Sequence, residues 1–296
     1  MTKKATTKRV GGITEYVRNG KLQYRSSTID PDKKKKLVST MKQGMSRWRM
    51  GNVNNLWSAF KYYGCQPRFQ SKSPGRTDYD EFKSYAMHAT AIYLTKEESK
   101  EAKASVLVPV TIAVGSLPSI EVGCDAVGVI SDISVGSLTL TDETTVGLLS
   151  QAIMHNNQGF RRGDILTFIV GFQHIDGAGI PRAQFRHHDL TLEPSNSQPL
   201  ASLPGSQEAF AIRDGRLAST VNSGAAAWVH CRPGSPTKAN DPDQYSTQTL
   251  WCANQELIDR YNSEEAILRA GQSYNGPKQE SFLTPEPTPD DLAGRN

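Results

Sequence analysis

The chain has 296 residues, of which 37% are hydrophobic and 22% charged, and its net charge is +4. This length accommodates two domains, or one domain with a long extension. The mean hydropathy of −0.51 does not indicate general disorder, and no apolar run approaches the ~20 residues that span a bilayer. The basic start MTKKATTKRVGG is not followed by the apolar segment of a signal peptide. We therefore expect no membrane partner, and a location in the cytoplasm or within a virus-like particle.

The net charge hides an uneven distribution along the chain. Residues 1–76 hold 18 Lys and Arg against 3 Asp and Glu, whereas residues 77–296 hold 16 against 27. A basic arm on an acidic body either binds a polyanion or docks on an acidic surface, such as that of a neighbouring copy.

The N-terminal part is predicted to be a hairpin followed by two helices. Residues 1–12 are expected to be a tail, and Ile13–Arg25 a β-hairpin that turns at Asn19-Gly20. A linker with four lysines leads into a helix over Leu37–Tyr63, whose apolar residues recur at helical spacing. A second helix is expected near Asp78, with Asp78 and Glu81 at capping-box spacing. The aromatic faces of the two helices should meet, and we place a domain boundary after Lys103.

From Ala104 the sequence favours short β-strands. Segments rich in β-branched residues alternate with Gly, Ser, Pro and Asp, and they are VLVPVTIAV, SIEV, AVGVISDI, SLTLT, GDILTFIVGFQHI and DLTLE. One helix interrupts them at about Thr145–His155. Later strands are expected at Ala209–Ile212, Arg216–Val221, Ala225–Cys231 and Thr247–Ala253, and a helix over about Asn254–Ala270.

These segments predict an α+β fold class: a β-hairpin plus an αα-hairpin, followed by a mainly antiparallel β-sandwich-like body. The expected divisions are residues 1–103 for the basic hairpin and helical arm, 104–194 for a β-rich domain, 195–276 for a second β-rich module with a C-terminal helix, and 277–296 for a proline-rich acidic tail. Whether residues 104–276 form one domain or two is left open.

No motif for catalysis, metal binding or cofactor binding stands out. The four cysteines (Cys65, Cys124, Cys231 and Cys252) form no CxxC pair, so buried free thiols are expected. His187, His188 and Asp189 are adjacent, but neighbours on a strand point to opposite faces. A zinc site from His230 and Cys231 with Cys252 or Cys124 lacks the usual ligand spacing. We therefore predict no metal, no cofactor and no catalytic residue, although an acid–base pair assembled only by the fold remains an alternative.

The basic arm is the candidate contact surface. Its positive residues alternate with aromatic ones, and cations neutralise phosphate while exposed rings stack on bases. In the competing interpretation the aromatic residues are core and the lysines only solvate the surface. The candidate contact residues, for nucleic acid or a neighbouring subunit, are Arg18, Lys21, Arg25, Lys33, Lys34, Lys35, Lys36, Lys42, Arg47, Arg49, Lys61 and Arg68.

The order of several short motifs resembles a family of Bacteroidota proteins known as a domain of unknown function. The motifs are TEYVRNGK (Thr14–Lys21), NNLWSAF (Asn54–Phe60), IYLTK (Ile92–Lys96), GSLPSI (Gly115–Ile120), TTVGLLSQAI (Thr144–Ile153), RGDILTFI (Arg162–Ile169), STQTL (Ser246–Leu250) and SYNGP (Ser273–Pro277). The resemblance covers nearly the whole chain and implies a basic arm ahead of β-rich modules, as in phage or mobile-element assembly proteins.

Three functions follow as hypotheses. The first is a non-enzymatic structural or assembly protein, phage- or mobile-element-associated, that forms homo-oligomers or joins other assembly subunits through its arm. The second is a free-standing protein that binds DNA or RNA with little sequence selectivity. The third is a hydrolase whose site leaves no linear motif.

Overall fold

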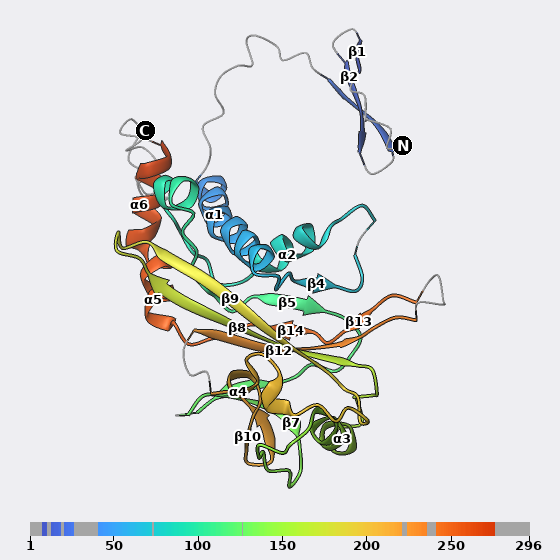
Figure 1. The fold of residues 1–296 in the computed structure, drawn as a ribbon. Helices are drawn as coiled ribbons and strands as arrows, with labels where there is room; N and C mark the ends of the chain where they lie inside the picture. The colour runs from blue at the N-terminus through green and yellow to red at the C-terminus, as the bar shows by residue number, and fades with distance from the viewer. Residues whose placement is uncertain are drawn as a thin grey trace, which may run out of the picture.

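The computed structural model describes residues 8–10, 13–18, 21–26, 41–72, 74–125, 127–220, 224–235 and 241–275. The fold class is α+β, with several antiparallel sheets that form a β-sandwich-like body, as the sequence predicts (Figure 1). Within these ranges no helix is both long and apolar enough to cross a membrane. Of the expected linker over Ser26–Lys36, Ser26 belongs to a strand, and residues 27–36 lie outside the described residues, as does the C-terminal tail.

The N-terminal hairpin is confirmed. Strands β2 (Ile13–Arg18) and β3 (Lys21–Ser26) pair antiparallel, with Arg18 opposite Lys21. A third strand, β1 (Lys8–Val10), pairs with β2, so part of the expected tail is ordered as a strand. The sheet order β1-β2-β3 leaves β3 at one edge.

The two predicted helices are α1 (Met41–Tyr62) and α2 (Asp78–Ala86). The capping box of α2 is formed by Thr77 and Asp80, one residue earlier than predicted, because the Thr77 hydroxyl accepts from the Asp80 amide while the Asp80 carboxylate accepts from the Thr77 amide. The aromatic faces do meet: the rings of Trp57 and Phe82 lie 5.5 Å apart and those of Phe60 and Phe82 5.9 Å apart.

The centre of the body is one antiparallel sheet in the order β13-β12-β8-β9, with β15 also paired to β12. Its strands are β8 (Ile165–Ile175), β9 (Pro181–Thr191), β12 (Ala225–Arg232), β13 (Gln244–Tyr245) and β15 (Trp251–Cys252). Strand β9 begins eight residues before the strand start predicted at Asp189. The prediction missed the first half of the strand because that half carries polar and charged residues in place of β-branched ones.

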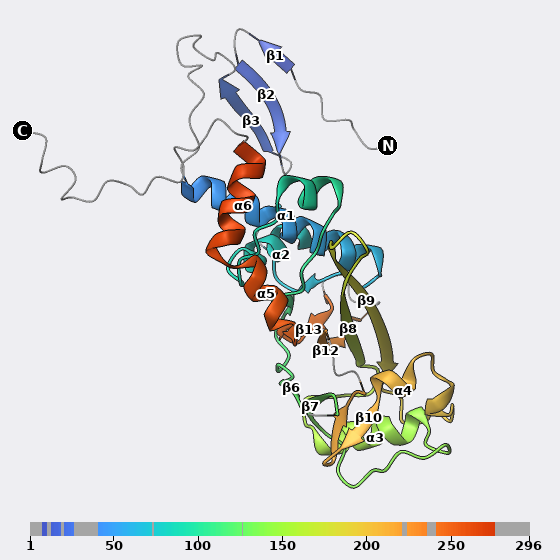
Figure 2. The same ribbon diagram turned by 90° about the vertical axis from the view of Figure 1, so that its left-hand side faces the viewer.

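The two faces of this sheet belong to two different cores. On β12, Ala225, Ala227 and Val229 point to the core beneath α1 and α2. The alternate residues Ala226 and Trp228 point to the core around α3 (Val146–Asn156). This alternation follows from the period of two along a strand. Figures 1 and 2 show the helices α1 and α2 on one side of the sheet and α3 on the other.

Two smaller sheets complete the body. One has the order β10-β11-β7-β6, and its strands are β6 (Val122–Cys124), β7 (Val129–Ser134), β10 (Ala211–Arg213) and β11 (Arg216–Ala218). The other has the order β14-β5-β4, and its strands are β4 (Arg68–Phe69), β5 (Thr111–Val114) and β14 (Gln248–Thr249). The pair β4–β5 is parallel. The expected strand at SLTLT is absent, since residues 137–141 are turn and irregular backbone.

The first half of the predicted strand VLVPVTIAV is buried but makes no sheet ladder. Side-chain amides satisfy its backbone instead: Asn52 donates to the Val106 carbonyl at 3.0 Å and accepts from the Val106 amide at 2.8 Å. Gln173 accepts from the Leu107 amide at 2.7 Å. Pro109, which has no amide hydrogen, interrupts the segment. An extended buried segment therefore needs no neighbouring strand when side chains act as its partners.

The predicted C-terminal helix is two helices, α5 (Gln255–Tyr261) and α6 (Glu264–Asn275), with a break at Asn262 and Ser263. The break lets α6 pack on α1, where Ala266 and Ala270 contact Trp48 and Tyr93 in a third core. Short helical segments lie at Glu97–Glu101 (η2), Leu200–Ser202 (η3) and Ser206–Ala209 (α4).

The core beneath α1 and α2 draws on all three segments that the sequence divides at residues 103 and 194. It contains Phe60 from the first, Phe185 from the second and Val229 from the third. The rings of Phe60 and Phe185 are stacked with centroids 4.0 Å apart. The proposed divisions remain predictions, but the helices and the sheet share one hydrophobic core.

Candidate functional site: the basic arm and a polar cleft

The candidate contact residues lie on three parts of the structure. Arg18, Lys21 and Arg25 belong to the hairpin, and Lys42, Arg47 and Lys61 are exposed on α1. Lys33, Lys34, Lys35 and Lys36 lie outside the described residues. The hairpin also exposes two apolar side chains of β3, since Leu22 is 51% and Tyr24 66% exposed.

Two of the candidate contact residues, Arg49 and Arg68, lie neither on the hairpin nor among the exposed side chains of α1. The half-buried Arg49 donates to the carbonyls of Met87 and Ala89 at 2.8 and 3.0 Å, so its guanidinium ties α1 to the end of α2 and is not presented to a phosphate. Arg68 lies on β4, where its side chain lines a cleft in the body. The structure therefore does not join all the predicted cations into one surface.

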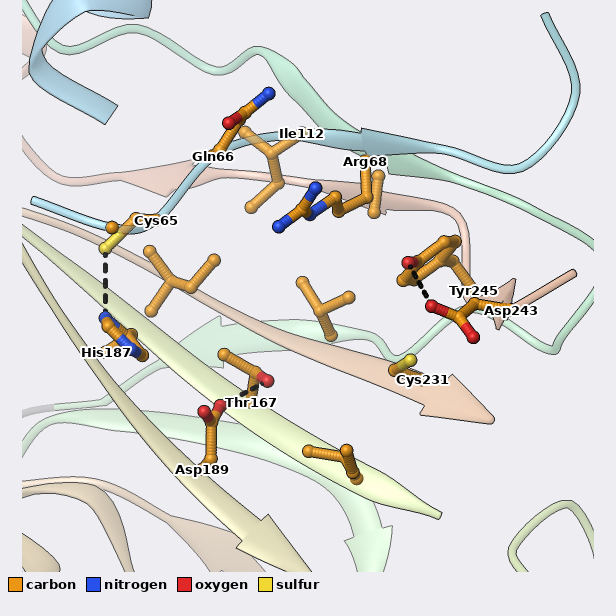
Figure 3. A pocket seen from close by; sticks show the side chains of 15 residues that line it. Cys65, Gln66, Arg68, Ile112, Thr167, His187, Asp189, Cys231, Asp243 and Tyr245 are labelled. Carbon is orange, nitrogen blue, oxygen red and sulfur yellow. Dashed lines mark hydrogen bonds between the residues drawn. The ribbon is translucent and has the colours of Figure 1, made fainter. Parts of the chain in front are cut away.

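This cleft lies between the central sheet and the β14-β5-β4 sheet and has a volume of about 340 Å³. Its floor is apolar and consists of Ile112, Ile165, Ile169 and Val229. Its polar lining consists of Cys65, Gln66, Arg68, Thr167, His187, Asp189, Cys231, Asp243 and Tyr245 (Figure 3). It forms where the core beneath α1 and α2 opens to the surface.

The end of α1 delivers Cys65 to the cleft. Gly64 has a φ of +73°, and the amides of Gly64 and Cys65 donate to the carbonyls of Lys61 and Phe60 at 3.3 and 2.9 Å. This is the Schellman arrangement, which favours glycine because the left-handed conformation disfavours a Cβ. Directly across the cleft, His187 and Asp189 project from alternate positions of β9, opposite Ile169 and Thr167 of β8.

The pair of Cys65 and His187 has the residue types of a nucleophile and a base. The Cys65 Sγ lies 3.7 Å from the His187 Nδ1. However, burial, and then the negative charge of Asp189, raise the pKa of the Cys65 thiol to about 12. A reactive cysteine needs a lowered pKa, because the thiolate is the nucleophile. The raised pKa therefore works against the thiolate form of Cys65 that a nucleophile needs.

The other polar groups of the cleft are mostly paired with each other. The Thr167 hydroxyl donates to Asp189 at 2.6 Å, and the Tyr245 hydroxyl donates to Asp243 at 3.2 Å. Burial raises the pKa of Tyr245, and the nearby Cys231 and Asp243 act in the same direction. No hydrogen bond or ion pair of the Arg68 guanidinium is found in the described parts of the chain. The cleft can hold a small polar molecule by hydrogen bonds to these groups.

A buried charge network lies on the opposite face of the sheet. Asp164 accepts from His230 at 2.7 Å and from two nitrogens of Arg232 at 2.9 and 2.8 Å. Burial acts to raise the pKa of Asp164, but the hydrogen bonds from His230 and Arg232 outweigh it and lower the pKa to about 2. Beside His230 lies a hollow of only about 150 Å³. The network fixes the start of β8 against β12, and the hollow beside it leaves little room for a substrate.

The alternation expected for the histidine runs is present. His187 and Asp189 line the cleft, whereas His188 faces the other side, where its Nε2 lies 3.4 Å from Glu208. His230 contacts Asp164, whereas Cys231 lines the cleft. Among the described residues, no group of three or more His, Cys, Asp and Glu side chains is placed to hold a metal ion. All four cysteines are free, but only Cys65 is buried, and Cys124 is exposed, which corrects the expectation of four buried thiols.

The sequence did not reveal the cleft. Cys65 and His187 are 122 positions apart, and neither lies in a motif. Asp243 is exposed, yet it also lines the cleft and accepts a hydrogen bond from the Tyr245 hydroxyl. One local signal exists: Thr167 is a polar residue between Ile165 and Ile169 on the same face of β8.

Comparison of the chain with models of known protein families, with curated proteins and with solved structures finds no match to any of them. The resemblance to a Bacteroidota family therefore remains a prediction from the motifs.

Proposed function

We propose that this chain is a non-enzymatic structural or assembly protein, of the phage or mobile-element type that the sequence resemblance implies, whose basic N-terminal arm contacts neighbouring copies. The observation that carries the proposal is the arm itself. It is a small, basic β-sheet that is paired, among the described residues, only within itself. Further along the chain, residues 77–296 have an excess of 11 acidic residues.

The surface of the hairpin supports a docking role. Strand β3 carries Lys21 and Arg25, and between them the exposed side chains of Leu22 and Tyr24. Exposed apolar residues rimmed by charges are typical of protein contact surfaces. Opposite charges on arm and body attract copies to one another and favour a head-to-tail arrangement, because the two contacting surfaces differ.

The side-chain chemistry of the cleft also supports a non-enzymatic function, although less directly than the arm does. Its candidate nucleophile and base, Cys65 and His187, are in contact, but the pKa of the thiol is raised rather than lowered. The hydrolase hypothesis would need an activated nucleophile or a pair of carboxyl groups free to exchange protons. In the cleft Asp189 and Asp243 are each engaged by a hydroxyl group.

The test is a pair of charge-reversal variants of the full chain. Lys21→Glu combined with Arg25→Glu reverses two charges of the hairpin. The matched control is Lys96→Glu combined with Lys100→Glu, two exposed lysines at the short helix η2 of the body. Sedimentation velocity at low salt should show assemblies for the natural chain and for the control, and mainly single copies for the hairpin variant, since like charges then face each other.

An equal degree of assembly in the hairpin variant and the control contradicts the proposal.

The exposed Lys42, Arg47 and Lys61 of α1 favour the second candidate, a nucleic-acid-binding protein. Fluorescence anisotropy with single- and double-stranded DNA distinguishes the two. If the chain stays a single copy but binds DNA with an affinity that falls steeply with salt, as phosphate contacts require, the binding function replaces the assembly function.

A further inference from the structure

The central sheet ends in an edge that is open for part of its length. Strand β9 is the outermost strand and pairs only with β8 among the described residues (Figure 2). The hydrogen bond from the Asp176 amide to the Ile180 carbonyl sets which residues of β9 face β8. Because the pattern alternates in an antiparallel pair, the even-numbered residues of β9 bond to β8 and the odd-numbered ones point their N–H and C=O groups outward.

The outward groups are satisfied at only one end of the strand. Ser105 covers the beginning, because its amide donates to the Pro181 carbonyl and its hydroxyl accepts from the Ala183 amide, both at 2.9 Å. For Phe185, His187 and Asp189 no backbone partner is found in the described ranges. These three residues therefore form a free strand edge.

The free edge borders two hollows. One is the cleft described above, which His187 and Asp189 line. The other has a volume of about 600 Å³ and is lined from both faces of the sheet, by Tyr63 and Phe185 on one side and Leu203 and Glu208 on the other. Space beside an unpaired edge, with pockets on both faces, is the arrangement by which proteins accept an added β-strand.

Strand β3 of the hairpin has the complementary edge. Arg18 and Lys21 close the hairpin as a directly opposed pair, and such a closing pair exchanges its hydrogen bonds. Because bonded and non-bonded residues alternate along the strand, Leu22, Tyr24 and Ser26 point their N–H and C=O groups away from β2. Among the described residues β3 pairs with no other strand. Each edge thus offers three outward residues at a spacing of two.

We infer that β3 of one copy adds to the free edge of β9 in the next copy and extends its central sheet. This rests on the proposed assembly function and names the contact that it would use. Residues that face each other across a strand pair have their side chains on the same face. Leu22 and Tyr24 therefore lie on the face of Phe185 and His187, beside Tyr63, where their exposed apolar area is covered.

On the other face of the sheet, Glu208 lies beside the edge, 3.6 Å from Arg186 and 3.4 Å from His188. Donor and acceptor edges are different surfaces of the same chain, so each copy can accept one β3 and donate another. Contacts of this kind are heterologous and produce chains or rings of copies. A free edge left uncovered would instead invite unspecific pairing.

Two proline variants of the full chain test the inference. In His187→Pro the lost amide hydrogen points away from β8, so the ladder within the sheet remains, but the edge loses a donor and gains a bulky ring. Tyr24→Pro does the same to β3. The matched controls His187→Thr and Tyr24→Thr remove the same side chains and keep the amide. Circular dichroism melting establishes that each variant is folded.

Sedimentation velocity gives the outcome. Both threonine controls should still assemble, although more weakly than the natural chain because each loses a side chain on the contact face, and each proline variant alone should remain a single copy. An equimolar mixture of the two proline variants should form dimers and nothing larger, because a His187→Pro copy can donate β3 to a Tyr24→Pro copy but cannot accept one. If one proline variant fails to fold, hydrogen exchange on the natural chain decides: the amides of Tyr24 and His187 should become protected on assembly.

Three results would overturn the inference. The first is assembly of the folded proline variants at the natural level, and the second is a mixture that stays monomeric. The third is protection of the same amides in single copies, which would mean that the hairpin covers its own β9. If the natural chain assembles and the charge reversals on β3 abolish assembly while the proline variants do not, the proposed function stands and only this contact is wrong. If the natural chain never assembles, both fail.

Discussion

Asp164 carries a buried charge that contributes to stability. It is 2% exposed, as is His230, and its two oxygens accept bonds from His230 and Arg232. A buried cation that loses its anionic partner is strongly destabilising. Asp164→Asn should therefore lower the free energy of unfolding by about 3 kcal/mol, measured by urea denaturation. The control Asp142→Asn, at an exposed acid before α3, should change it by less than about 0.5 kcal/mol.

The same carboxyl predicts an acid dependence of stability. Its pKa is lowered from 3.8 to about 2, so the unfolded state binds a proton at a higher pH than the folded state does. The stabilisation is complete above about pH 5, declines below it, and is lost once the pH falls through about 2. Melting temperatures between pH 6 and pH 2 should show this loss in the natural chain and a weaker dependence in Asp164→Asn. Parallel curves would contradict the assignment.

The four thiols should differ in their reactivity. Burial raises the pKa of the Cys252 thiol to about 12 and of the Cys231 thiol to about 11, and Cys65 behaves alike. Cys124 alone is exposed. Titration of the folded protein with Ellman's reagent at pH 7.5 should reveal one rapidly reacting thiol, and four after unfolding. A second fast thiol mapped to Cys65 would show that His187 activates it, and would revive the hydrolase hypothesis.

Among the elements, α1 is joined to the central sheet by the stacked rings of Phe60 and Phe185. Both side chains are almost fully buried. Phe60→Ala should lower the free energy of unfolding by about 4 kcal/mol, through lost burial and the cavity that remains. Tyr62→Ala, two positions away on a side chain that is 82% exposed, should change it by less than about 0.5 kcal/mol. Similar losses in both variants would mean that α1 does not pack as described.

Elements with a complete local signal were predictable from the sequence. Helix α3 has a threonine cap at Thr145 and ends at Asn156, close to the predicted bounds. The hairpin β2–β3 follows its Asn-Gly signal. These segments depend on short-range chemistry, which a single sequence contains.

Elements that depend on distant partners were not predictable. Strand β9 has a polar first half and is a strand because β8 pairs with it over eleven residues. The segment at Val106 looks like a strand, but Asn52, 54 positions earlier, satisfies its backbone. The cleft has the same origin, because it gathers Cys65, His187 and Tyr245 from three separate regions of the chain.

At the scale of the molecule, one core spans the helices and the sheet. A truncated chain that starts at Ala104 would lose α1, α2 and β4, and would expose Phe185 and its neighbours to water. We expect it to lack a cooperative melting transition, as followed by circular dichroism. The expected division after residue 103 predicts the opposite result, a β-rich part that folds alone. A cooperative transition in the truncated chain would support that division.

The division of charge also belongs to the whole molecule. The hairpin and the start of α1 are basic, the remainder is acidic, and both β3 and the middle of β9 have unpaired edges among the described residues. The attraction between arm and body acts over about 10 Å at 0.1 M salt, so it guides copies together, whereas backbone pairing is less sensitive to salt. At high salt the copies should therefore associate more slowly. The assembly should also be weaker, because salt screens the attraction between arm and body.

In the proposed assembly, the arm of one copy contacts another copy without any nucleic acid. The most direct test is light scattering after size exclusion, on the nuclease-treated full chain, over a range of concentrations at low and high salt. We expect a mass above the 32.5 kDa of one copy that rises with concentration and falls at high salt. A mass of 32.5 kDa under every condition would contradict it.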